Sequence, residues 1–138
     1  MKPFLSRKAT IRGGRDGDIQ AATSGLDLSM AKPPEMGGEA SKKTNPEEIF
    51  SMGYAACFAS SLEYLLQNSM TNFEAIEVEA TTHLVADGDQ GFKFSIDLEV
   101  EVRGLNKEVA QAFTAKALNF CPYSKAIKGN VDVTTQIK

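Results

Sequence analysis

The chain has 138 residues, of which 42% are hydrophobic and 24% are charged, with a net charge of −3 at pH 7. This composition is typical of one soluble globular domain spanning residues 1–138 and not of a disordered chain. A chain with this small negative net charge does not have the basic surface of nucleic-acid-binding proteins, so no nucleic acid is expected as a partner. The opening residues contain no apolar run of the kind found in signal peptides, and we therefore expect a cytoplasmic protein.

The first thirty residues are predicted to form short strands separated by glycine turns. Strands are expected near residues 8–12, 18–22 and 26–31. The pairs Gly13-Gly14 and Asp16-Gly17 are turn signals of the kind found in β-hairpins. They place Arg15 at or near the tip of a hairpin.

A long helix is predicted to start after a polar loop over residues 32–44. Asn45 suits the helix cap, Pro46 suits the first helical position, and Glu48 completes the spacing of a capping box. We expect the helix to run to about Gln67. Its length also fits a membrane-spanning segment, but its polar residues and its cap favour a buried core helix, so no membrane is expected.

This predicted helix is apolar or small on nearly every face. A single sheet can cover only one side of a helix, so a second surface must cover the rest. In so small a chain, a second subunit is the natural candidate. The sequence therefore predicts a homodimer.

The second half of the chain is predicted to contain a hairpin, a helix and a final strand. Alternation of apolar and polar residues over 76–81 and 92–102 indicates two strands with one buried face each. A helix is expected over 106–120, a short turn of helix after Pro122, and a strand over 130–137. This order predicts an α+β domain whose helices pack against an antiparallel sheet.

The chain has two cysteines, Cys57 within the predicted long helix and Cys121 directly before Pro122. A free cysteine in an apolar helix is usually an inert core residue, and for Cys57 this interpretation stays open. A helix dipole favours the thiolate of a cysteine at a helix N-terminus, as predicted for Cys121, but Cys57 lies about three turns inside its helix. A reactive Cys57 therefore needs a cation from elsewhere in the chain.

Arginine or lysine must supply that cation, because the only histidine, His83, lies in the middle of a predicted strand. Arg15, between glycines on an exposed turn, is the best placed. Glu47, on the first turn of the long helix, could hold this arginine in a bidentate pair. A zinc site made of Cys57, Cys121 and His83 is disfavoured because their spacing matches no closed zinc site, so no metal is expected.

Four motifs occur in one order: Gly13-Gly14-Arg15-Asp16-Gly17, Asn45-Pro46-Glu47-Glu48, Gly53-Tyr54-Ala55-Ala56-Cys57-Phe58 and Cys121-Pro122-Tyr123-Ser124. Together they closely resemble the organic hydroperoxide resistance (Ohr) proteins of the OsmC superfamily, over nearly the whole chain. Gly-Tyr before Ala-Ala-Cys, and Tyr after Cys-Pro, resemble the Ohr branch more than the OsmC branch. Departures from the family pattern occur at Leu118, Lys125, Ile127 and Lys128.

This resemblance implies a thiol peroxidase that reduces organic hydroperoxides to alcohols. Cys57 matches the peroxidatic cysteine, Cys121 the resolving cysteine, Arg15 the activating arginine and Glu47 its carboxylate partner. The resemblance also implies an intertwined homodimer with two active sites at its interface, without a bound cofactor. The implied reductant is a dihydrolipoyl-type dithiol on a lipoylated protein. Two alternatives keep the fold: a non-catalytic redox-sensing dimer that uses the same disulfide, and a peroxidase of the OsmC branch.

Apolar side chains near Cys57 in the predicted fold are candidates for a substrate pocket. These are Phe50, Met52, Phe58, Phe92 and Phe94. A simpler interpretation, that each is an ordinary core residue, stays open. If some of them line a pocket, organic hydroperoxides should be better substrates than hydrogen peroxide, because burial of apolar groups adds binding energy.

Overall fold

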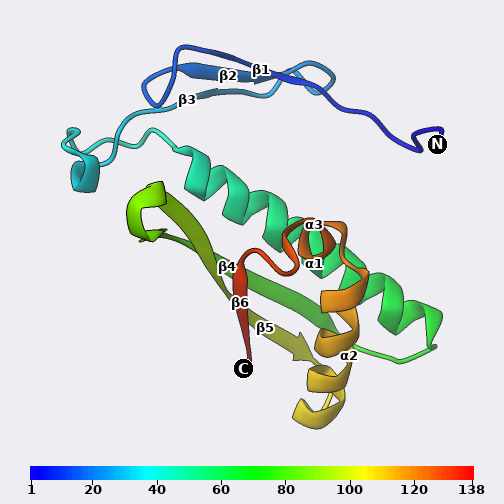
Figure 1. The fold of residues 1–138 in the computed structure, drawn as a ribbon. Coiled ribbons are helices and arrows are strands. Elements are labelled where there is room, and N and C mark those ends of the chain that lie inside the picture. Colours follow the sequence, from blue (N-terminus) through cyan, green and yellow to red (C-terminus); the bar gives the residue numbers. More distant parts are fainter. The chain divides into compact units, whose positions relative to one another are not determined.

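The computed structural model describes all residues from Met1 to Lys138, and Figure 1 shows its elements in chain order. The chain forms two compact units, Met1–Ile49 and Phe50–Lys138. That both units act as one domain stays a prediction.

The first unit contains a three-stranded antiparallel sheet of the predicted kind. Its strands are β1 (Ala9–Arg12), β2 (Asp18–Ala21) and β3 (Asp27–Ser29), in the order β1-β2-β3. The β1–β2 hairpin closes with Arg12 opposite Asp18, and its turn holds Gly13 at a left-handed φ of +94°. The Gly17 N–H donates to the Gly14 carbonyl at 2.9 Å, which fixes the turn that carries Arg15. A 3-10 turn, η1 (Pro34–Met36), lies in the loop that follows.

The long helix α1 (Pro46–Asn68) begins where the sequence predicts. Asn45 caps it, because the Glu48 N–H donates to Asn45 Oδ1 at 2.8 Å. The second half of the expected capping box is absent: the Glu48 carboxylate accepts from the Thr44 hydroxyl at 2.6 Å instead. By length and composition α1 could span a membrane, but core helices of soluble proteins pass the same test.

The second unit is built on the hairpin β4 (Ala75–Ala86) and β5 (Phe92–Arg103), joined by the 3-10 turn η2 (Gly88–Gln90). The helices α2 (Lys107–Phe120) and α3 (Pro122–Ile127) then lead to β6 (Asp132–Ile137). This last strand pairs with β5 in parallel, so the sheet β4-β5-β6 is mixed, and the expectation of a purely antiparallel sheet is wrong here. The reason is the connection, because a helical crossover of this length lets the next strand run in the same direction.

The core of the second unit lies between α1, α2 and one face of the sheet. A single stripe of α1 at four-residue spacing is fully buried: Tyr54, Phe58, Leu62 and Leu66. It meets alternate residues of β5 and three residues of α2: Ile96, Leu98, Val100, Val102, Ala110, Phe113 and Ala117. The period of two that the sequence shows in β5 is thus the period of its burial.

Two aromatic residues depart from the predicted burial pattern. Phe92 is 69% exposed, because it pairs with Ala86 at the turn end of the hairpin. Phe120 falls on the inner face of α2 by its spacing from the buried Phe113 and Ala117, but it is 42% exposed and stacks on Tyr64 of α1, with ring centroids 5.3 Å apart. The buried face of α2 includes Thr114 instead.

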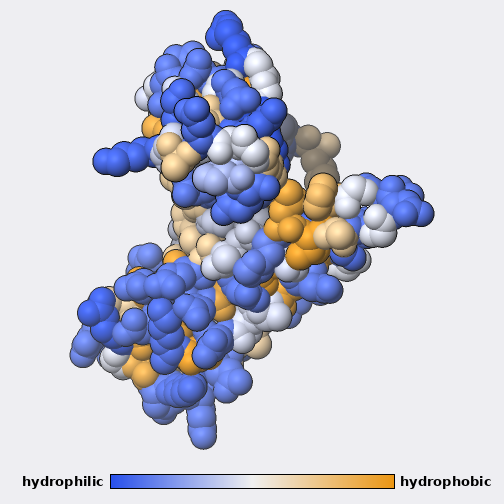
Figure 2. Space-filling view, turned by 90° about the vertical axis from the view of Figure 1, so that its left-hand side faces the viewer, coloured by the Kyte–Doolittle hydropathy of each residue, from blue (hydrophilic) through white to orange (hydrophobic).

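The opposite face of α1 is not covered by the other elements of the second unit. Residues along one exposed stripe at four-residue spacing are uncharged: Met52, Ala56, Ser60 and Tyr64. The exposed fractions are 55% for Met52 and 53% for Tyr64. Figure 2 shows apolar patches, in orange, within a mostly hydrophilic surface. We call Met52, Ala56, Ser60 and Tyr64 the α1 stripe.

Candidate active site

Cys57 and Cys121 come from two different elements of the second unit. Cys57 is half-buried in the middle of α1, where the Ser61 hydroxyl donates to its backbone carbonyl at 2.9 Å. Cys121 is fully buried at the junction of α2 and α3. Its N–H closes α2 by donating to the Ala117 carbonyl at 2.8 Å, and Pro122 then starts α3. The helix α2 ends here because Pro122 has no N–H that could donate to a carbonyl of the preceding turn.

The two sulfur atoms face each other although 64 positions separate the residues in the sequence. The distance from Cys121 Sγ to Cys57 Sγ is 3.5 Å, and both thiols are free. A disulfide has a sulfur–sulfur bond of about 2.0 Å, so bonding requires a further approach of about 1.5 Å. The two thiols are therefore close enough for a disulfide to form after a small movement.

The surroundings of Cys57 within the second unit oppose ionisation of its thiol. Burial is the main cause of a raised pKa for Cys57, and the neighbouring Cys121 adds to it. Hydrogen bonding from the Tyr123 backbone N–H lowers this pKa but does not offset burial. None of these groups of the second unit is a cation.

The first unit holds the predicted pair of Arg15 and Glu47. Arg15 Nη1 donates to Glu47 Oε2 at 2.8 Å, and Arg15 Nη2 donates to Glu47 Oε1, so the pair is bidentate as the sequence suggests. The side chains are 30% and 15% exposed, respectively. The hydrogen bonds between these two side chains lower the pKa of the Glu47 carboxyl and raise the pKa of the Arg15 guanidinium. This arrangement keeps both charges at neutral pH.

The five candidate pocket residues lie in different environments. Phe50 and Phe94 pack edge to face with ring centroids 5.1 Å apart, and Phe50 also packs against Tyr123 at 5.9 Å. Phe58 is fully buried in the core, whereas Met52 and Phe92 are exposed. A pocket-lining role for any of the five stays a prediction.

Several residues close to the cysteines were not singled out individually from the sequence. The Tyr54 hydroxyl hydrogen-bonds the Ser124 hydroxyl at 2.6 Å inside the core, and the Tyr54 and Tyr123 rings stack with centroids 5.9 Å apart. All three belong to motifs that carry the family resemblance. No periodicity or spacing in the sequence indicates that these two distant motifs are in contact, so the contact could not be predicted from the sequence pattern.

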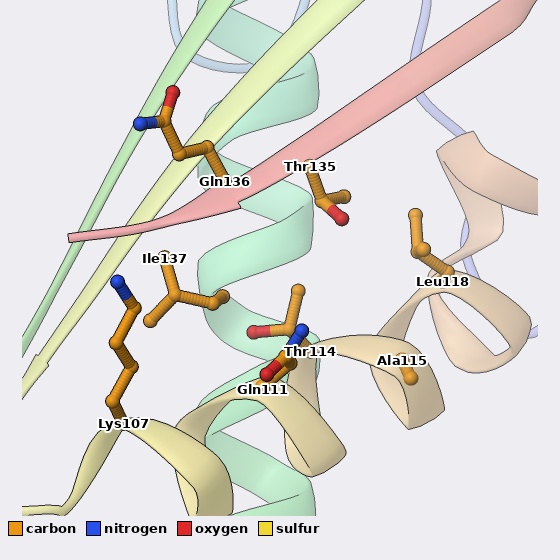
Figure 3. A pocket seen from close by; sticks show the side chains of 8 residues that line it. All are labelled: Lys107, Gln111, Thr114, Ala115, Leu118, Thr135, Gln136 and Ile137. Atoms are coloured by element: carbon orange, nitrogen blue, oxygen red, sulfur yellow. The ribbon is translucent and has the colours of Figure 1, made fainter.

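Other candidate sites do not include the cysteines. Figure 3 shows a cleft between α2 and β6, lined by Thr114, Leu118 and Ile137 among others. The buried Thr114 hydroxyl in this cleft has no hydrogen-bond partner. His83 pairs with Asp97 at 2.8 Å on the solvent side of the sheet. No three Cys, His, Asp or Glu side chains come together in a group that could hold a metal ion.

A family model and several curated proteins are similar to this chain over most of its length. The family model described as "OsmC-like protein" matches residues 38–136. The organic hydroperoxide resistance protein OhrB of Bacillus subtilis is 40% identical over 136 residues, covering 98% of each chain. The organic hydroperoxide resistance protein-like 2 of Staphylococcus epidermidis is 40% identical over 126 residues, covering 91% of this chain and 89% of its own length.

Crystal structures of related proteins have the same fold. An organic hydroperoxide resistance protein from Legionella pneumophila superposes with a TM-score of 0.94 at 39% identity, covering 99% of both chains. The Bacillus subtilis OhrB structure superposes with a TM-score of 0.88 at 38% identity, covering 99% of this chain and 100% of that one. The similarity extends across the α+β fold and is not confined to the motifs.

The Arg15–Glu47 pair predicts a defined pH dependence of stability. The pKa of Glu47 is lowered in the folded protein, so the pair contributes stability that is fully present above the unfolded pKa of about 4.3 and is lost as the pH falls through the folded pKa. We expect the free energy of unfolding to differ between wild type and Arg15→Ala by a constant amount above about pH 5.5, and by less at lower pH.

Urea unfolding across this pH range measures the difference. Arg7→Ala is a matched control, because Arg7 is exposed and bonds only to the Ser6 carbonyl. A difference between wild type and Arg15→Ala that keeps its full size down to about pH 2 would show that Glu47 does not stabilise the pair as a carboxylate.

Proposed function

We propose that this chain, which belongs to the OsmC family, is a cysteine-based peroxidase that reduces organic hydroperoxides to alcohols. The observation that carries the proposal is the 3.5 Å separation of Cys57 Sγ and Cys121 Sγ. The names of the curated relatives support organic hydroperoxides as the substrate class. We infer that residues 1–138 act as one domain, in the cytoplasm, where a disulfide between these cysteines would be transient.

The proposed reaction has three balanced steps. The Cys57 thiolate attacks the distal oxygen of the hydroperoxide, the O–O bond breaks, and the alkoxide leaves and is protonated to the alcohol. Cys57 is thereby oxidised to a sulfenic acid. The Cys121 thiol displaces the sulfenic oxygen as water and forms the Cys57–Cys121 disulfide. A dithiol then reduces this disulfide by exchange and becomes a disulfide itself.

Activation of Cys57 requires a partly desolvated cation. Lowering a thiol pKa by about two units corresponds to about 2.7 kcal/mol, and an exposed ion pair supplies only about 0–1 kcal/mol. Burial already raises the pKa of Cys57, so the required stabilisation is larger still. The guanidinium of Arg15, held in a fixed orientation by Glu47, has the charge and the planar donor geometry for this task. It can also stabilise the leaving alkoxide through hydrogen bonds.

The position of Glu47 on α1 indicates which chain supplies this arginine. Glu47 and Cys57 are ten residues apart on one continuous helix, and ten residues of α-helix rise by about 15 Å. Side chains on a helix lean toward its N-terminus, which brings the Glu47 carboxylate no closer to Cys57. A guanidinium bound to Glu47 is therefore out of reach of Cys57 on the same helix. We infer that Arg15 of one chain acts on Cys57 of a second copy.

The α1 stripe supports the homodimer that this arrangement needs. Its uncharged residues are exposed in the single chain, and the small residues Ala56 and Ser60 in its middle allow close helix–helix approach. A two-fold axis across the stripe makes the two copies of α1 antiparallel. Where this axis passes near Met52, at the N-terminal end of the stripe, residue 47 of the partner helix lies opposite residue 57, and the partner's Arg15–Glu47 pair then lies alongside Cys57.

Aromatic side chains next to the cysteines support an apolar substrate. Phe50, Phe94 and Tyr123 form an edge-to-face cluster beside Tyr54. Each CH₂ group buried there adds about 0.8 kcal/mol, which is about fourfold in affinity. For the reductant we propose a dihydrolipoyl-type dithiol, free or on a lipoylated protein, as the family resemblance implies.

A steady-state assay tests the proposed function. We expect the protein to consume cumene hydroperoxide with dihydrolipoamide as reductant, with a kcat/KM at least about tenfold above that for hydrogen peroxide. Equal efficiency for the two peroxides would contradict the apolar pocket. Formation of the Cys57–Cys121 disulfide without turnover by any dithiol would favour the redox-sensing alternative.

Arg15→Lys tests the role of the planar guanidinium. We expect this variant to keep a reactive Cys57 thiolate, measured by its alkylation rate at neutral pH, because the positive charge remains. Its rate of hydroperoxide reduction should fall by at least about tenfold, because lysine lacks the bidentate fork that holds Glu47 and orients the peroxide. A rate close to that of wild type would disprove this role.

Mixed dimers test the supply of Arg15 from the partner chain. Neither an Arg15→Ala homodimer nor a Cys57→Ser homodimer should be active. A heterodimer of the two, isolated with different affinity tags after co-expression, should have one intact site and about half of the wild-type rate. An inactive heterodimer would show that Arg15 serves Cys57 of its own chain. Sedimentation of the wild-type protein as a monomer would disprove the dimer itself.

A further inference from the structure

Gly53 is an unexpected residue in the interior of α1. It lies one turn before Cys57 in a helix that runs from Pro46 to Asn68. Glycine in the middle of a helix costs about 1 kcal/mol relative to alanine, because it loses more backbone freedom on folding. Its backbone here is ordinary helix and does not need a left-handed φ. Some other feature of the structure must therefore compensate for the cost.

The side chain of Tyr123 occupies the space that a larger residue would need. A Cβ atom at position 53 would lie closer than 3.0 Å to the Tyr123 hydroxyl oxygen, 3.0 Å from its Cζ and 3.2 Å from its Cε1. The ring contacts both Phe50 and Tyr54, with centroids 5.9 Å away in each case, and a shift of the 37% exposed Tyr123 away from the new methyl group would disturb these contacts. Glycine is thus what lets the tyrosine ring lie directly on the backbone of α1.

A second contact fixes the same two segments to each other. The hydroxyls of Tyr54 and Ser124 are 2.6 Å apart and fully inside the core. Consecutive residues of α1 (Gly53 and Tyr54) therefore hold consecutive residues of α3 (Tyr123 and Ser124). Cys57 follows one turn later on α1, and Cys121 lies just before the held part of α3. We call these two contacts the α1–α3 clamp.

We propose that the α1–α3 clamp sets the rate of disulfide formation by holding Cys121 Sγ against Cys57 Sγ, and that Gly53 is a positioning residue for this step. This inference rests on the proposed peroxidase function. No side chain of the clamp takes part in the reaction of either sulfur atom. It acts on the second chemical step, in which the Cys121 thiol must reach the sulfenic sulfur, and not on the first, in which only Cys57 reacts with the hydroperoxide.

The chemical consequence is a choice between two fates of the Cys57 sulfenic acid. Attack by the Cys121 thiol gives the disulfide and releases water. Attack by the sulfenate on a second hydroperoxide gives the sulfinic acid and a second alcohol, and ordinary thiols do not reverse that oxidation. A looser clamp slows the first path and leaves the second unchanged. The fraction of sulfinic acid after several turnovers therefore reports how well the clamp positions Cys121.

Gly53→Ala and its combination with Tyr123→Phe test the clamp. In Gly53→Ala the new methyl group displaces the Tyr123 ring, and we expect disulfide formation to slow by at least about tenfold, because misplacements of about 1 Å have effects of up to a hundredfold. The rate of sulfenic acid formation should fall by less than the rate of disulfide formation, because only Cys57 and the hydroperoxide react in that first step. In the double variant the atom closest to the methyl group is gone, and most of the lost rate should return.

The two steps are followed after rapid mixing with one equivalent of cumene hydroperoxide, by quenched alkylation of free thiols and intact mass. Excess hydroperoxide then gives the fraction of protein that carries two added oxygens. Thermal unfolding followed by circular dichroism is the control for a purely structural effect. Alanine is the better helix former, so Gly53→Ala should start from the same helix content as wild type.

Each outcome decides a different claim. If wild-type Cys57 is not oxidised, the proposed function fails and not the clamp alone. If Gly53→Ala forms its disulfide at the wild-type rate, the clamp is disproved while the peroxidase function stands. If the double variant stays as slow as Gly53→Ala, the contact with the Tyr123 hydroxyl is not the cause and the inference is wrong.

Discussion

The approach of Cys121 to Cys57 is the contact on which the rest of this structure depends. It requires α1 to bury one face against the sheet, α2 to end at a fixed residue, and the chain to turn sharply there. Burial of the Tyr54–Leu66 stripe satisfies the first requirement, and Pro122 satisfies the other two. The resulting 3.5 Å separation joins two segments that have no local relation in the sequence. The proposed disulfide chemistry therefore rests on this packing more than on any single residue.

The same packing creates a conflict with reactivity. Burial brings the sulfur atoms together but raises the pKa of Cys57, which disfavours the thiolate that must react. In the proposed mechanism an arginine already held in a bidentate pair resolves this conflict, because its orientation is fixed before it binds the thiolate and little further entropy is lost. Because α1 separates Glu47 from Cys57, the proposed mechanism requires two chains. The exposed α1 stripe is the proposed interface between them.

Local patterns in the sequence were enough to predict most elements of the fold, whereas the roles of Cys57, Cys121, Arg15 and Glu47 come from the family resemblance and stay predictions. The cap at Asn45 and the alternation along β5 depend on near neighbours, which is why both were predicted. The parallel pairing of β6 was not, because it is decided by how the α2–α3 connection crosses the sheet. The contact of Gly53 with Tyr123 was missed for a related reason: a glycine in a helix signals a close approach but not the residue that approaches.

Free-thiol titration combined with intact mass, before and after one equivalent of cumene hydroperoxide, tests the central claim most directly. The account predicts that both thiols of each chain disappear and that the mass falls by two hydrogens, which identifies the Cys57–Cys121 disulfide. Two unchanged thiols would contradict it and make both cysteines ordinary core residues. Loss of one thiol with a gain of oxygen would contradict it differently, because Cys57 would react without Cys121 resolving it.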